Sequence, residues 1–309
     1  MTGAEAFQYM LQFSVNILSN PFRDGRKTRY ALTLWLAIAI VFCASGVVQA
    51  QQLTAGSSAR QFKDQGIAAV PFGVLTEDTQ LKLKPVLEKT SLYRRLPQMG
   101  VECDADYFRF LVRHPEVIVE IWKLMEVTKM NTTRTGPYTL QSNDGAGTLS
   151  ELELVYGDSE KHIYYGTGTY EGPLLRRKLS GKVVLVLQTK HGFTEEGKPN
   201  AVSQLDVFLK VDNVAAGVIA RTLQPLVGPT ADHNFTQSLR FFERLHDTTV
   251  RNGPGVQLMA ERLDLQPDVL KGFQQVAGTA FERGRQKFAA PKIERRASSG
   301  PQIRSFKSR

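Results

Sequence analysis

Cysteine is scarce in this sequence. Only Cys43 and Cys103 occur among the 309 residues, and Cys43 lies within a long apolar run. If that run is removed or held in a membrane, one thiol remains, so the rest of the chain cannot form an internal disulfide. The residues next to Cys103 do not form the pattern that surrounds a nucleophilic cysteine. We therefore predict that Cys103 is a small buried apolar residue.

Catalytic motifs are also missing. The sequence contains no GxSxG, HExxH or CxxC motif, no P-loop and no glycine-rich dinucleotide fingerprint. The pairs Gly145-Ala-Gly147 and Gly166-Thr-Gly168 fall between or within expected strands and predict turns or bulges. A site assembled from several strands could still join His162, His191 and His233. We expect no catalytic residue, no metal and no cofactor, and the sequence leaves enzymatic activity open.

Positive charge is absent from the body of the chain. The net charge is +9, of which residues 1–30 hold +2 and residues 271–309 hold +8, leaving −1 for residues 31–270. Residues 266–309 turn polar and basic, and we predict a disordered tail there. Such a tail can contact an anionic surface, but Phe306 is its one aromatic residue near the end that could stack on a base. This composition argues against nucleic acid as a partner.

One long apolar run stands near the start of the chain. The stretch ALTLWLAIAIVFCASGVV at 31–48 follows the basic stretch RDGRKTRY, and no charged residue occurs from Ala31 to Ala59. This order is typical of an export signal, with Val48 and Ala50 placing cleavage before Gln51. The alternatives are an uncleaved membrane anchor and a buried core helix. We expect residues 1–50 to export the chain to the periplasm or outside the cell, or to anchor it with a cytoplasmic N-terminus.

The remaining residues predict an α+β fold. Residues 51–70 are small and polar and indicate a linker, followed by a domain over 71–265. Pro85 predicts a helix start, and 101–103 predicts a short strand. Asp104 is a plausible N-cap for one helix, and Pro115 opens the next. Alternating β-branched runs between residues 131 and 212 then predict an antiparallel meander, before a helical segment that spans 213–251.

This element order resembles the START-like (SRPBCC) helix-grip superfamily. The residues that carry the resemblance are CDADYFRFLVRHPEVIVEIWKL at 103–124, similar to the opening helix pair of that superfamily, and LQPLVGPTADHNFTQSLRFFERL at 223–245, in the place of its long helix. The resemblance implies a curved antiparallel sheet of about six strands that grips a long C-terminal helix, preceded by short helices.

The resemblance also implies a cavity between the sheet and the long helix that holds a lipid or another apolar molecule. Its lining would include aromatic residues from the helices and strands: Trp122, Tyr165, Tyr170, Phe208, Phe235 and Phe242. The sequence therefore favours an exported, non-enzymatic binding domain. The alternative is a scaffold protein of the cell envelope, with a solid core and a basic tail for contacts.

Overall fold

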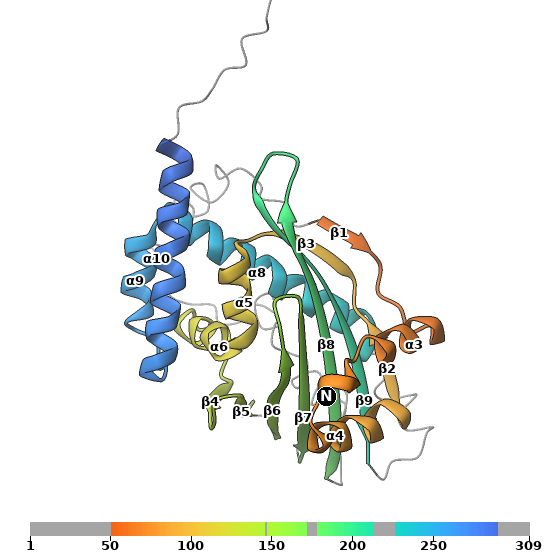
Figure 1. Cartoon of the computed structure of the whole chain (residues 1–309). Coiled ribbons are helices and arrows are strands. Elements are labelled where there is room, and N and C mark those ends of the chain that lie inside the picture. The colour runs from red at the N-terminus through yellow and green to blue at the C-terminus, as the bar shows by residue number, and fades with distance from the viewer. Residues whose placement is uncertain (1–50, 146, 172–177, 213–225, 290–309) are drawn as a thin grey trace, which may run out of the picture.

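The computed structural model describes residues 51–145, 147–171, 178–212 and 226–289 (Figure 1). The predicted export segment at 1–50 lies outside these residues. So do residues 213–225 of the predicted helical segment and residues 290–309 of the predicted tail. None of the helices in the described part of the chain combines the length and the apolarity that a bilayer crossing requires.

Nine antiparallel strands form one open sheet. The strands are β1 (Gln51–Thr54), β2 (Leu92–Arg95), β3 (Gln98–Glu102), β4 (Asn131–Arg134), β5 (Thr139–Asn143), β6 (Thr148–Gly157), β7 (Lys161–Tyr170), β8 (Leu179–Phe193) and β9 (Pro199–Val211). Their order across the sheet is β1-β3-β9-β8-β7-β6-β5-β4, and β2 pairs with β9 alongside β3. The predicted meander is β4–β9, and the predicted short strand at 101–103 overlaps β3. The prediction of about six strands is wrong because β1, β2 and β3 join the same sheet.

Seven α-helices and two short irregular helices lie in the described ranges. The α-helices are α3 (Arg60–Ala68), α4 (Glu77–Glu88), α5 (Ala105–Arg113), α6 (Pro115–Leu124), α8 (Ala231–Arg251), α9 (Gly253–Ala260) and α10 (Pro267–Ala289), with η1 (Phe72–Val74) and η3 (Leu226–Thr230) beside them. Between residues 98 and 251, the described residues therefore form a short strand, two helices, six antiparallel strands and a long helix. This is the element order of a helix-grip-type fold.

These helices divide between the two faces and one end of the sheet. Figure 1 shows α8 crossing one face, α3 and α4 lying on the other, and α9 and α10 beside α5 and α6. The larger hydrophobic cluster joins the α8 face to α5, α6 and α10, and it includes Phe108, Leu239 and Phe273. A second cluster lies under α3 and α4 and includes Leu83 and Phe208.

The residues before Leu92 are not a simple linker and helix. Within the predicted linker at 51–70, β1 adds to the edge of β3 and α3 packs near β2. The helix α4 begins before Pro85, because the Thr76 hydroxyl accepts a hydrogen bond from the Thr79 backbone N–H (3.3 Å) and acidic residues fill the first turn. Pro85 therefore lies inside α4, and the prediction that a helix starts there is wrong.

A buried ion pair holds this N-terminal segment to the sheet. Asp206 of β9 is fully buried and accepts hydrogen bonds from Arg95 Nε (2.8 Å), Arg95 Nη2 (2.9 Å) and the Tyr93 hydroxyl (2.6 Å). Arg95 Nη1 also donates to Gln65 of α3 (2.7 Å). Three donors around one carboxylate compensate for the loss of water on burial.

The predicted disordered tail is wrong for residues 267–289. They form α10, in which Val269, Phe273, Ala277 and Ala280 are buried at helical spacing. Arg283 donates from Nη2 to Asp106 (3.2 Å) and also contacts Asp104. A basic helix therefore belongs to the folded domain.

Asp104 is the N-cap residue of α5, as predicted, although its side chain makes no capping hydrogen bond. Its carboxylate lies near His246 and Arg283 instead, and although burial opposes ionisation, these partners hold its pKa below the ordinary value, with the His246 hydrogen bond the largest cause. Pro115 opens α6, as predicted. Cys103 is buried, as predicted, and burial raises the pKa of its thiol.

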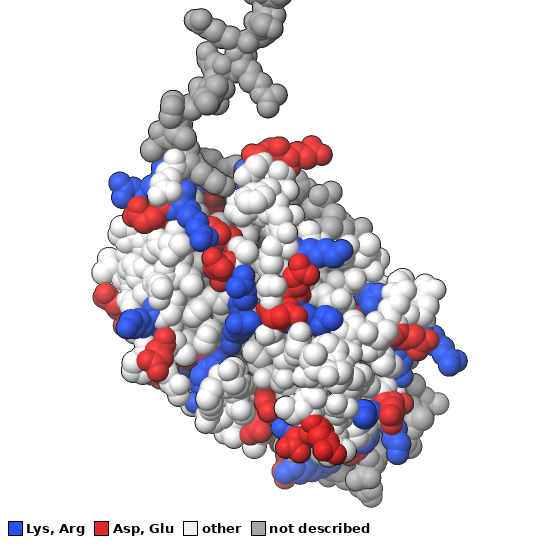
Figure 2. Space-filling view, in the orientation of Figure 1, with Lys and Arg blue, Asp and Glu red and all other residues white. Residues whose placement is uncertain are grey.

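A tight turn joins the two longest strands. It connects β8 to β9, and its Gly197 adopts a φ of 75°, which favours glycine. Figure 2 shows Lys and Arg side chains interleaved with Asp and Glu on the face in view. This mixture agrees with the nearly neutral body of the chain.

Candidate functional site

The face of the sheet toward α8 is the first candidate site. Alternate residues of each strand lie on this face. Tyr164 identifies the residues that do so, because its hydroxyl donates to the Val112 carbonyl of α5. Several leucines share the face and pack against the larger cluster, but each is only partly buried: Leu152, Leu154, Leu179, Leu185 and Leu205. The helices therefore cover this apolar surface without sealing it.

Four of the six predicted ligand contacts fit this location. Trp122 and Phe235 belong to the larger cluster, and Phe242 packs against it, with its ring centroid 5.5 Å from that of Phe108. Tyr170 is buried, and it lies six residues from Tyr164 along β7, which places it on the same face. Whether any of them contacts a ligand stays a prediction.

Tyr165 and Phe208 lie on the other face of the sheet. Phe208 is completely buried in the second cluster, 5.0 Å from the Tyr93 ring, and Tyr165 packs against the same cluster. Side chains one residue apart on a strand point to opposite faces of the sheet. The sequence alone does not show which of these two faces contacts α8. Their assignment to a cavity beside α8 is therefore wrong.

A basic cluster lies between α5 and the sheet. Arg113 donates from Nε to Nε2 of His162 on β7 (3.0 Å), and Arg109 and His191 lie near enough to lower the pKa of His162 as well. Burial is the largest cause, and together these effects lower that pKa from 6.5 to about 4. The pKa of His191 is also lowered, first by burial and then by Arg109.

The hydrogen bond from Arg113 fixes the proton on His162. A neutral imidazole that accepts at Nε2 carries its proton on Nδ1. This Nδ1 is buried and has no partner among the described residues, and the same holds for Nε of Arg109 and Nδ1 of His191. The cluster thus places two arginine guanidinium groups beside buried ring nitrogens that have no partner among the described residues.

The sequence analysis only partly anticipated this cluster. The sequence alternative that joined His162, His191 and His233 placed two of the three correctly, whereas His233 is exposed near the start of α8. The two arginines were not anticipated, because a helix and two strands bring them to the histidines. Across the ranges that the structure describes, no group of three or more His, Cys, Asp or Glu residues could hold a metal ion.

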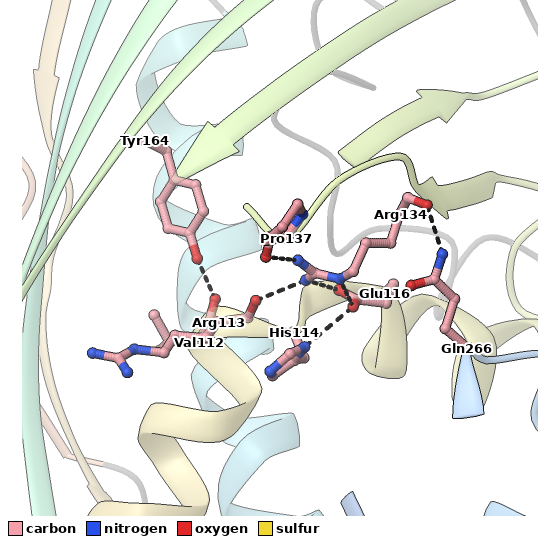
Figure 3. A network of polar contacts seen from close by, with 8 residues as sticks. All are labelled: Val112, Arg113, His114, Glu116, Arg134, Pro137, Tyr164 and Gln266. Carbon is pink, nitrogen blue, oxygen red and sulfur yellow. Dashed lines mark hydrogen bonds and ion pairs between the residues drawn. The ribbon is translucent and has the colours of Figure 1, made fainter. Parts of the chain in front are cut away.

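A second polar network joins α6 to the edge strand β4 (Figure 3). Glu116 accepts from Arg134 at both oxygens, with distances of 2.6 Å to Nε and 3.0 Å to Nη2. Burial alone would raise the pKa of Glu116, but hydrogen bonds from His114 and Arg134 hold it below its ordinary value. Gln266, just before α10, donates to the Arg134 carbonyl (2.9 Å).

Comparisons with known proteins find only distant likenesses. No family model matches the chain, and no curated protein matches it. An uncharacterised protein from Rhizobium leguminosarum has 12% identity and a TM-score of 0.30, and the alignment covers 49% of this chain and 95% of that one. The di-domain ARO/CYC BexL from the BE-7585A biosynthetic pathway has 16% identity and a TM-score of 0.30, with 52% of each chain covered.

This chain therefore spans about half the length of the di-domain protein. At these TM-scores neither likeness carries an argument about the site. The class that the structure defines is an α+β protein with a helix-grip-type arrangement, and this description rests on its own element and strand order.

Proposed function

We propose that the protein is a non-enzymatic binding module of the START-like type, which takes up an apolar small molecule or lipid between the sheet and α8. The observation that carries the proposal is the row of partly buried leucines on this face, such as Leu185 at its centre. Removing such surface from water is worth about 25 cal/mol per Å², so a bound apolar molecule gains by covering it.

The test is native mass spectrometry of the purified full chain, with and without added oleate. We expect retained oleate, and a Leu185→Gln variant should retain about tenfold less, because its amide would lose water without gaining a partner. Leu81→Gln is the matched control, since Leu81 is 64% exposed on α4, on the other face of the sheet. Thermal unfolding of both variants separates lost binding from lost folding. A chain that never retains oleate, or equal losses in both variants, would contradict the proposal and favour a scaffold with a solid core.

We also propose that residues 1–50 direct export or anchor the chain in a membrane, and that the basic C-terminal residues contact an anionic surface. The apolar run at 31–48 and its basic flank support the first proposal, and the charge of +8 on residues 271–309 supports the second. Cell fractionation of the full chain and of a chain beginning at Gln51 tests export. Recovery of both in the same fraction would contradict it.

A further inference from the structure

The basic cluster beside α5 lies at one end of the apolar face that meets α8. His162 and Tyr164 point to the same face of the sheet, because they are two residues apart on β7. In the pairing of β7 with β8, Leu187 lies opposite His162 and Leu185 lies opposite Tyr164. The row of leucines therefore begins directly beside a buried imidazole ring.

Two buried N–H groups of this cluster have no acceptor. His162 is 2% exposed, and its Nε2 accepts from Arg113, so the proton of the neutral ring is on Nδ1. This Nδ1 is buried, and no described residue accepts from it. The Nε–H of Arg109 is likewise buried without an acceptor in the described part of the chain, although the side chain as a whole is 31% exposed. Buried donors in native proteins nearly always have an acceptor, so these two require one from outside the described residues.

The two guanidinium groups of the cluster are also short of negative charge. Arg113 donates to the Asp158 carbonyl (3.1 Å), but no carboxylate of the described residues forms an ion pair with it. The Asp158 carboxylate accepts instead from the Tyr156 hydroxyl (2.7 Å) and from two backbone N–H groups of its own turn. Arg109 lies 3.4 Å from Asp106, whose side chain is 54% exposed. An acceptor that carries a negative charge therefore suits this position better than a neutral one.

We propose that the apolar molecule bound on this face is an alkyl carboxylic acid, whose carboxylate lies between Arg109 and His162. The inference rests on the proposed function, because it assigns the polar end of the same ligand. The two oxygens of a carboxylate match the two buried donors, and its charge offsets that of Arg113. The alkyl chain then runs from His162 over Leu185 and covers the partly buried leucines.

The test is isothermal titration of the full chain with octanoate and with 1-octanol at neutral pH and low ionic strength. The two ligands share the same alkyl chain length and differ in the charge of the head group. We expect octanoate to bind at least about tenfold more tightly, because hydrogen bonds to an ionised acceptor are the stronger ones. Arg109→Gln should weaken octanoate about tenfold and leave octanol unchanged, and Arg109→Lys, which keeps the charge, should lie between.

Arg60→Gln is the matched control, because it removes a guanidinium group that is 93% exposed on α3, on the other face of the sheet. It should leave both affinities unchanged. Thermal unfolding of each variant shows whether it folds. If Arg109→Gln does not, Arg109→Lys and the comparison of the two ligands on the native chain decide the matter.

Three results would overturn the inference. Equal affinities for octanoate and octanol would leave the proposed function intact but would show that water satisfies the buried donors. Phosphate binding as tightly as octanoate would show that the cluster holds a free anion instead of a head group. Binding of neither octanoate nor octanol would contradict the proposed function, and the inference would fail with it.

Discussion

Protonation of His162 should lower the free energy of unfolding of the domain in mild acid. Its side chain is buried, with 2% of the residue exposed, and it accepts a hydrogen bond from Arg113, while Arg109, His191 and Asp158 are the other charged or titratable groups acting on it. A protonated ring could not accept that hydrogen bond, and two positive charges would then face each other across 3.0 Å. The neutral ring is therefore the form that the folded state favours.

The size of the effect follows from the difference in pKa between the two states. Folding lowers the pKa of His162 from 6.5 to about 4. The contribution of the neutral His162 ring to the free energy of unfolding is complete above pH 6.5. It is lost as the pH falls from 6.5 to about 4, because the histidine of the unfolded chain is protonated first. At about 1.4 kcal/mol per pKa unit, the upper limit is roughly 3 kcal/mol.

The assay is urea unfolding at several pH values between 8 and 4, for the native chain and for His162→Gln. Glutamine can accept from Arg113 and does not titrate, so the difference between the two chains isolates the histidine. Between pH 8 and 4, we expect the free energy of unfolding of the native chain to fall by up to roughly 3 kcal/mol more than that of the variant. This corresponds to a change of about 1 M in the urea midpoint. The exposed His233→Gln should behave like the native chain. If the native chain and His162→Gln lose stability in parallel, the reasoning is refuted.

Three further predictions concern the packing. Phe273→Ala should lower the free energy of unfolding by about 3–5 kcal/mol in a urea titration, because this fully buried ring joins α10 to the core. Asp206→Ala should cost a similar amount, about 3–5 kcal/mol, since it leaves the Arg95 guanidinium buried without its partner; calorimetry would show a lower melting temperature. Gly66→Ala should cost about 1–3 kcal/mol by thermal unfolding, because a Cβ there would lie 2.9 Å from a buried phenylalanine ring, whereas Gly73→Ala, with nothing within 4 Å, should be nearly neutral. Equal effects of the two glycine substitutions would contradict the packing argument.

Local chemistry explains the parts of the fold that could be predicted. Pro115 opens α6, as its missing N–H and fixed φ allow, and the alternating strands after residue 130 form β4–β9. Each of these features is decided by residues close together in the chain.

The features that were missed depend on distant residues or on mixed signals. In α10 the apolar spacing of Val269, Phe273, Ala277 and Ala280 was present, but the high basic charge around it favoured a disordered tail. The cluster around His162 requires the pairing of β7 with β8 and the position of α5, and neither can be inferred from spacing along the sequence.

The pairing of β2 with β9 also limits how the chain can fold as it is synthesised. Tyr93 lies opposite Phe208, and Arg95 lies opposite Asp206, so β2 acquires its neighbour only after more than a hundred further residues. Until then the apolar surface of the N-terminal segment has no sheet to cover it, and long-range pairing of this kind is slow. The nascent chain therefore carries this surface uncovered while the residues between β2 and β9 are synthesised.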